Sequence, residues 1–189
     1  MLQLQIAELI KHYDGLAETN SSKFGITLSG PVAFNVSSQE AEDISDSFEI
    51  EVFIPYEFPE VHPTVWDANG KLDTDFGHIN PDGTSCLAVP LDIYEALDRK
   101  PTLLGFFDSL VVPFLYSYSH WKRFGLLPFG ERSHGEAGFL EYYLDLFSST
   151  SAHNVLKGVI SLLTDGYQPH EKCPCGSGKK TLRCHSNES

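Results

Sequence analysis

The chain has 189 residues, and its 13 lysines and arginines stand against 26 aspartates and glutamates, a formal net charge of −13. A hydrophobic share of 41% is enough for one folded domain and a small appendage. So acidic a surface repels phosphate backbones and anionic lipids. The composition therefore argues against nucleic-acid and membrane partners.

The first sixteen residues predict an amphipathic helix. Their apolar side chains follow a helical period, at Leu2, Ile6, Leu9, Ile10, Tyr13 and Leu16. The segment has neither the basic start nor the apolar run of a secretion signal, and no stretch of the chain is long enough for a membrane span. We therefore expect a cytoplasmic protein.

Strands are predicted next along the chain. Residues 24–28 and 32–36 are apolar enough for two strands, with a turn expected at Gly30-Pro31 between them. The polar, acidic residues 37–46 predict a surface loop. Residues 47–54 alternate apolar and polar side chains, which predicts a strand with one face in water.

A long loop and then helices are predicted for the rest of the chain. Residues 55–90 are rich in proline, glycine and aspartate, and a loop of this length usually carries function. Helical spacing follows in residues 101–118, where Pro113 is expected to kink or break the helix. Further helices are predicted after a capping box at 133–136 and over 152–163. This order predicts an α+β fold.

Two segments of this loop region resemble ubiquitin-conjugating enzymes. Residues 48–66, FEIEVFIPYEFPEVHPTVW, are similar to that family's third strand and the following loop, with Pro59 and Pro63 at the loop prolines. Residues 77–90, GHINPDGTSCLAVP, resemble its His-Pro-Asn motif and catalytic cysteine, matched by His78, Asn80 and Cys86.

The chain departs from the family pattern at two points. Ile79 stands in place of the motif's middle proline, and the spacing from Asn80 to Cys86 is shorter. These departures leave the position of the Asn80 side chain open.

The resemblance implies a ubiquitin-conjugating-like fold and a thioester-forming Cys86. Acyl transfer of this kind needs a reachable thiol and a donor for the oxyanion, which the amide of Asn80 can supply without titrating. His78 is expected to hold the loop in shape rather than to act as a base. The C-terminal glycine of a partner protein would be the acyl group.

Charge around Cys86 argues against a protease. Residues 72–98 contain no lysine or arginine and six acids, namely Asp73, Asp75, Asp82, Asp92, Glu95 and Asp98. Acidic neighbours are expected to raise the pKa of a thiol, whereas a protease needs it lowered. A carrier of activated acyl groups tolerates a raised value.

Other functions remain open for this segment. Cys86 could be a buried structural residue, and the fold could serve as a non-catalytic binding module. A cysteine hydrolase that removes conjugates would use Cys86 with His78 or His134.

Bacterial members of the family occur in antiphage operons of the CBASS type, so the resemblance implies a CD-NTase-type nucleotidyltransferase, which makes cyclic dinucleotides, as the partner.

The last residues, CPCGSGKKTLRCH, resemble the SEC-C motif, a short zinc-binding module. Cys173, Cys175, Cys184 and His185 are the expected ligands, and three thiolates with one imidazole complete a tetrahedral shell, typical of structural zinc. The alternative is a disordered tail that contains cysteines. The expected domains are therefore residues 1–166, ubiquitin-conjugating-like, and residues 167–189, the zinc motif.

Overall fold

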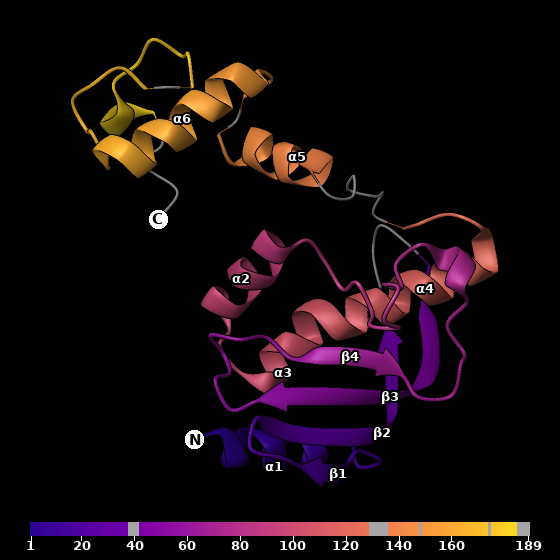
Figure 1. The fold of residues 1–189 in the computed structure, drawn as a ribbon. Coiled ribbons are helices and arrows are strands. Elements are labelled where there is room, and N and C mark those ends of the chain that lie inside the picture. Colours follow the sequence, from indigo (N-terminus) through magenta and orange to yellow (C-terminus); the bar gives the residue numbers. More distant parts are fainter. Residues whose placement is uncertain (38–41, 129–135, 148, 174, 185–189) are drawn as a thin grey trace. The chain divides into compact units, whose positions relative to one another are not determined.

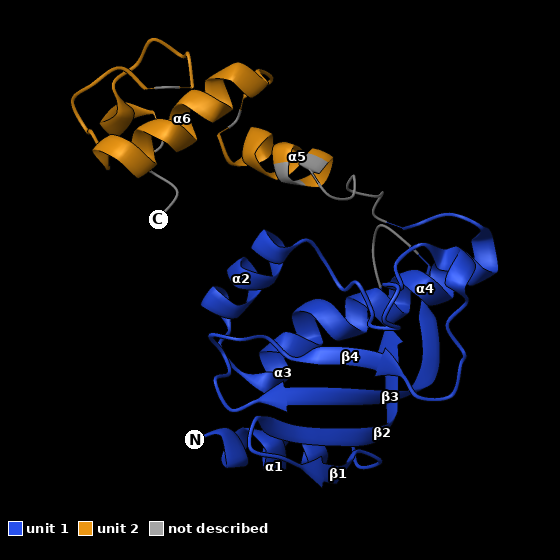
Figure 2. Ribbon diagram, in the orientation of Figure 1, with its two compact units in different colours: residues 1–131 blue, residues 132–189 orange. Residues whose placement is uncertain are grey.

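The computed structural model describes residues 1–37, 42–128, 136–147, 149–173 and 175–184. The chain divides into two compact units, residues 1–131 and 132–189 (Figure 2). The first unit combines an antiparallel sheet with helices, and so confirms the expected α+β class.

The sheet of the first unit has four strands in the order of the chain (Figure 1). They are β1 (Ala17–Ser21), β2 (Gly25–Val36), β3 (Ile44–Pro55) and β4 (Thr64–Asp67), and each is antiparallel to its neighbour. Successive antiparallel pairing keeps every connection between neighbouring strands short.

The turn predicted at Gly30-Pro31 is wrong, because β2 continues through it and Pro31 lies opposite Glu49 of β3. Gly30 has a φ of 144°, and a Cβ atom there would lie 2.1 Å from the carbonyl oxygen of Gly15. Glycine is thus required for a close approach of two chain segments, and not for a chain reversal.

The alternation expected for residues 47–54 is confirmed in β3, whose apolar side chains are buried and whose intervening polar ones are mostly exposed. The strand starts earlier than predicted, however. Ile44 is buried and pairs with Val36, so residues 44–46 belong to the sheet and not to the predicted acidic loop.

Helical elements precede and follow the sheet of the first unit along the chain. They are α1 (Leu2–His12), η1 (Thr74–Phe76), α2 (Pro90–Arg99), α3 (Leu103–Phe106), η2 (Phe107–Val111) and α4 (Val112–Phe124). Buried side chains of α1, α3, η2 and α4 form one apolar core with those of the sheet.

The long helix changes type just before Pro113 and does not end there. Pro113, which has no N–H to donate, is the second residue of α4. The preceding five residues, η2, form a π-helical segment. The chain therefore continues helically to Phe124 instead of breaking at the proline.

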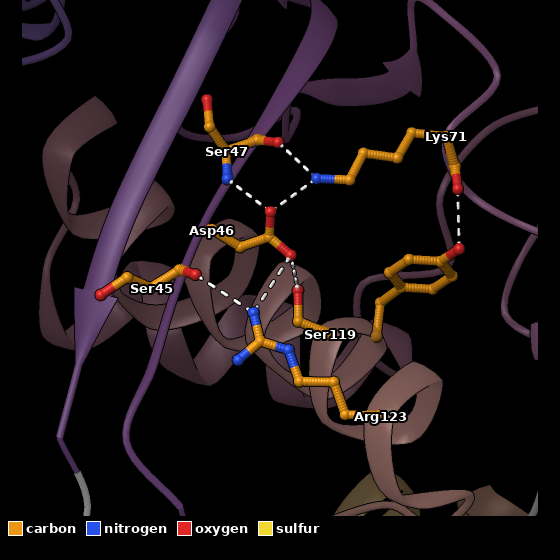
Figure 3. A network of polar contacts seen from close by, with 7 residues as sticks. Ser45, Asp46, Ser47, Lys71, Ser119 and Arg123 are labelled. Atoms are coloured by element: carbon orange, nitrogen blue, oxygen red, sulfur yellow. Dashed lines mark hydrogen bonds and ion pairs between the residues drawn. The ribbon is translucent and has the colours of Figure 1, made fainter.

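A polar network around Asp46 joins β3 to α4 (Figure 3). The Asp46 carboxylate accepts hydrogen bonds from Lys71 Nζ at 2.6 Å and from Ser119 Oγ at 2.8 Å, and Arg123 lies 3.9 Å away. Lys71 Nζ also donates to the carbonyl of Ser47 at 2.7 Å. These bonds tie the start of β3 to the helix that packs over it.

The second unit contains α5 (Glu136–Leu146), α6 (Ala152–Asp165) and η3 (Thr181–Arg183). Ser151 caps α6 by accepting a hydrogen bond from the backbone amide of Asn154 at 3.4 Å. The contacts group both α-helices with the cysteine segment, whereas the sequence places the domain boundary at residue 166. In the part of the chain that the structure describes, we find no helix with the length and apolar character needed to cross a membrane.

Candidate functional site

Cys86 follows directly on a segment that is hydrogen-bonded to β4. The amide of Ser85 donates to the carbonyl oxygen of Val65 at 2.8 Å, and the amide of Cys86 donates to that of His78, also at 2.8 Å. Thr84 forms a bridge with Trp66 in the same region. Backbone bonds on both sides therefore fix the position of the Cys86 backbone.

A tight turn separates His78 from Cys86. The amide of Gly83 donates to the carbonyl of Asn80 at 2.9 Å, and Gly83 has a φ of 83°, which favours glycine. Asn80 Nδ2 donates to Thr84 Oγ1 at 2.8 Å, and Thr84 Oγ1 donates to Asp82 Oδ1 at 2.6 Å. Hydrogen bonds from Thr84 lower the pKa of Asp82 below its usual range.

Asn80, predicted as an oxyanion donor, thus uses one N–H of its amide to close the turn. A primary amide has two N–H donors, so a second one remains on the same nitrogen. The bond to Thr84 orients the whole amide group. In this structure the Asn80 side chain closes the loop through its bond to Thr84.

The thiol of Cys86 is partly buried, and burial raises its pKa above the ordinary cysteine value. The direction agrees with the expectation from sequence, but the cause is burial and not the nearby acids. Some of these acids are paired, Asp73 with Lys122 and Glu95 with Arg99. A thiol of this kind is mostly protonated near neutral pH.

A cavity of about 510 Å³ lies next to Cys86 along the chain, between α2 and the helix that contains Pro113. Its walls include Leu87 and Ala88, which follow the cysteine directly, and the basic residues Arg99 and Lys100. Arg99 and Lys100 directly follow residues 72–98, the segment without lysine or arginine from which acidic surroundings of Cys86 were predicted.

His78 holds Cys86 through its main-chain carbonyl, and its ring packs on the ring of Phe76 with centroids 4.8 Å apart. It also lines a second hollow of about 440 Å³, together with Trp121 and Leu127. The sequence favoured a loop-holding role for His78, and these contacts are of that kind. His134, the other candidate histidine, lies outside the described residues.

Ser85 was missed by the reading of the sequence. Its side chain is 9% exposed, and its Oγ has no hydrogen-bond partner among the residues that the structure describes. A serine next to a candidate cysteine carries no signal in the sequence, and its pairing with Ile79 appears only in the structure.

The three cysteines near the C-terminus lie together. The sulfur atoms of Cys173, Cys175 and Cys184 are all within 4.8 Å of one another, and the last two are 3.5 Å apart. A tetrahedral ion with metal–sulfur bonds of about 2.3 Å separates two sulfurs by about 3.8 Å. The cluster could therefore hold a metal ion, while the fourth expected ligand, His185, lies outside the described residues.

Local backbone structure creates this cluster. Lys172 and Lys180 form an antiparallel bridge, and the Cys173 amide donates to the Lys179 carbonyl at 2.8 Å. Gly176 and Gly178, with φ of 82° and 74°, turn the chain between them. Burial and the neighbouring cysteines raise the pKa of Cys173 to about 12. A cation is what stabilises thiolates in such a setting.

The comparisons with family models, curated proteins and solved structures gave no match to this chain.

Proposed function

We propose that the chain is a conjugating-type acyl transferase, in which Cys86 Sγ forms a thioester with the C-terminal glycine of a partner protein. The observation that carries the proposal is the fixed backbone of Cys86, which is hydrogen-bonded to His78 and follows a residue bonded to β4. The next two residues along the chain, Leu87 and Ala88, line a cavity of about 510 Å³. Preorganisation of a nucleophile beside a hollow suits acyl transfer.

The order of elements supports the ubiquitin-conjugating-like fold. A helix precedes an antiparallel four-stranded meander, the cysteine loop follows β4, and helices complete the core. This is the order that the resemblance implies. Fold alone does not give function, so the proposal depends on the cysteine loop.

The chemistry requires an acyl group that arrives already activated, as an acyl adenylate or as a thioester of another protein. The sulfur–carbon bond forms as the bond from the carbonyl carbon to its leaving group breaks. The leaving group keeps the electron pair, and the thiol proton passes to solvent. Because the acyl group is activated, the raised pKa of Cys86 is tolerable.

The raised pKa disfavours the hydrolase alternative. A hydrolase that attacks amides needs a thiolate near neutral pH, and burial of Cys86 acts in the opposite direction. The non-catalytic binding module remains a second candidate, because one donor of the Asn80 amide is already bound by Thr84.

The partner and the metal follow from the two resemblances. We infer that a cyclic-dinucleotide-producing nucleotidyltransferase of a bacterial antiphage operon supplies the C-terminal glycine. We further infer that the cysteine cluster holds a structural zinc ion through Cys173, Cys175, Cys184 and His185. Such a site has no open position for catalysis and would stabilise a short loop by organising it.

Co-expression with a neighbouring nucleotidyltransferase that ends in glycine tests the acyl transfer. Intact-mass analysis under non-reducing conditions should find the adduct on the wild-type chain, and thiols should remove it. The Cys86→Ser variant should give a thiol-resistant ester and Cys86→Ala no adduct. The matched control is Ser85→Ala, which removes an unpartnered hydroxyl from the adjacent residue and should leave the adduct unchanged.

If Cys86 stays free with every such partner while Cys86→Ala keeps full defence activity in cells, the acyl-transfer proposal fails. The binding-module function would then be the one supported.

A further inference from the structure

The side chain of Asn154, on α6, reaches the cysteine loop of the second unit. Asn154 Nδ2 donates a hydrogen bond to the carbonyl oxygen of Cys175 at 3.1 Å. Asn154 lies in the first turn of α6, where Ser151 caps its backbone amide. The helix end and the loop are thus joined through the residue that supplies one of the three sulfurs.

Gly176, the residue after Cys175, lies so close to the Asn154 amide that it has no room for a side chain. A Cβ atom on Gly176 would lie 2.5 Å from Asn154 Nδ2, and Gly176 has a φ of 82°. The amide of Asn154 occupies the space that a side chain at position 176 would need. Glycine at 176 and asparagine at 154 therefore fit each other.

The carbonyl that Asn154 holds belongs to the peptide unit immediately after Cys175. Fixing it restricts the backbone of Cys175, and hence the direction in which Sγ points toward Cys184, 3.5 Å away. Outer-shell groups that orient a ligating side chain commonly contribute 10- to 100-fold to metal affinity. The bond from Asn154 would act on the orientation of the Cys175 thiol in the same way, but through the backbone.

Few residues of α6 are buried in the part of the chain that the structure describes. Val155 and Gly158 are buried, and Gly158 lies against the ring of Phe147. Leu156 and Ile160, by contrast, are each 58% exposed. A helix with so narrow a buried face depends on the contacts at its ends.

We propose that Asn154 is a positioning residue for a metal ion bound by the cysteine cluster, and that metal binding and the order of α6 are coupled through it. The inference rests on the proposed metal site, and it assigns a role to α6 that the cysteine motif does not contain. Loss of the metal should loosen the first turns of the helix, and loss of the Asn154 amide should weaken the metal.

The test uses the full-length chain and Co²⁺ as the probe, because cobalt bound to thiolates absorbs visibly and its titration gives an affinity. Asn154→Ala should weaken Co²⁺ binding by about 10- to 100-fold. Asn154→Asp, which keeps the shape but loses the donors, should weaken it at least as much. His153→Ala, an exposed neighbour on the same turn, is the matched control and should bind as the wild type does.

Two further measurements keep the inference open to refutation if a variant disturbs the fold. Gly176→Ala should also weaken binding, and the double variant with Asn154→Ala should lose less than the sum of the two, because the clash disappears with the amide. In the wild type, chelation of the metal should raise amide hydrogen exchange in residues 152–160 and leave the sheet of the first unit unchanged.

Binding within twofold of the wild type in both Asn154 variants, or unchanged exchange in α6 after chelation, would overturn the inference while leaving the metal site intact. A wild-type chain that binds no Co²⁺ would overturn both. The Cys86 adduct is measured separately, so neither result depends on acyl transfer.

Discussion

The amide of Cys86 is hydrogen-bonded to the carbonyl oxygen of His78 at 2.8 Å, so the candidate thiol and the expected loop-holding histidine meet through their backbones. Any residue at position 78 has a main-chain carbonyl that can accept this hydrogen bond, whatever its side chain. The His78 imidazole itself packs on Phe76.

Replacement of His78 by alanine should therefore affect stability more than chemistry. We expect the free energy of unfolding to fall by about 0.5–1.5 kcal/mol from the lost ring contact, and the rate of thioester formation to stay within about threefold. Denaturant titration and single-turnover mass analysis measure the two. A rate loss of about 10²-fold or more at unchanged stability would instead give the imidazole an acid–base role.

Asn80 and Thr84 should behave alike if the amide works by closing the turn. We expect Asn80→Ala to slow thioester formation by roughly five- to tenfold, since it removes a hydrogen bond of about 1 kcal/mol. Thr84→Val should slow it at least as much, because it removes that bond and also the bond from Thr84 to Asp82. Thr84→Ser keeps the hydroxyl and should retain most of the rate. A loss of about 10²–10³ with Asn80→Ala alone would identify the amide as the oxyanion donor.

The raised pKa of Cys86 predicts a slow thiol. Only the thiolate is alkylated, so at neutral pH the reaction of Cys86 should be slower than that of an exposed model cysteine, and it should accelerate until the pH passes a value above the ordinary pKa. Peptide mapping after pulsed alkylation measures Cys86 separately from the C-terminal cysteines. A rate that levels off below about pH 8 would show an activated thiolate.

Asp46 should make the first unit sensitive to acid. Burial opposes ionisation of its carboxyl, but hydrogen bonds from Lys71 and Ser119 outweigh it and lower the pKa. A lowered folded-state pKa stabilises the fold above the unfolded-state value of about 3.9, and this contribution is lost as the pH falls through the folded value.

The comparison variant is Asp46→Asn, which keeps the shape and removes the charge. It should be less stable than the wild type by about 1–2 kcal/mol near neutral pH, and the difference should shrink below about pH 4. Unfolding by urea at several pH values measures this. A difference that does not change with pH would mean that the charge of Asp46 is not what ties β3 to α4.

Local sequence patterns correctly predicted those elements whose burial follows from the order of neighbouring residues. The alternation in residues 47–54 identifies a strand because one face of β3 is buried and the other is mostly exposed to water. Adjacent residues of a strand point to opposite faces, so apolar and polar side chains alternate along the sequence. The helix predicted over 152–163 is confirmed as α6, and the structure adds Ser151 as its cap. The crowding of Cys173, Cys175 and Cys184 likewise follows from short spacing.

Gly30-Pro31 shows where local patterns fail. The same dipeptide serves a turn or a strand interior, and only the approach of Gly15 decides between them. The all-exposed strand β1 was missed because it has no apolar face, and is held by its pairing with β2. In both cases the deciding contact is with another segment, Gly15 for Gly30 and residues 26–29 for β1.

The sequence by itself determined the α+β class, the candidate thiol at Cys86 and the cysteine cluster, since each depends on residue type and short spacing. Tertiary structure alone decided that burial raises the pKa of Cys86, that the Asn80 amide binds Thr84, and that Asn154 reaches Cys175. Burial and side-chain direction arise from the packing of segments distant along the chain, and no local pattern of residues encodes them.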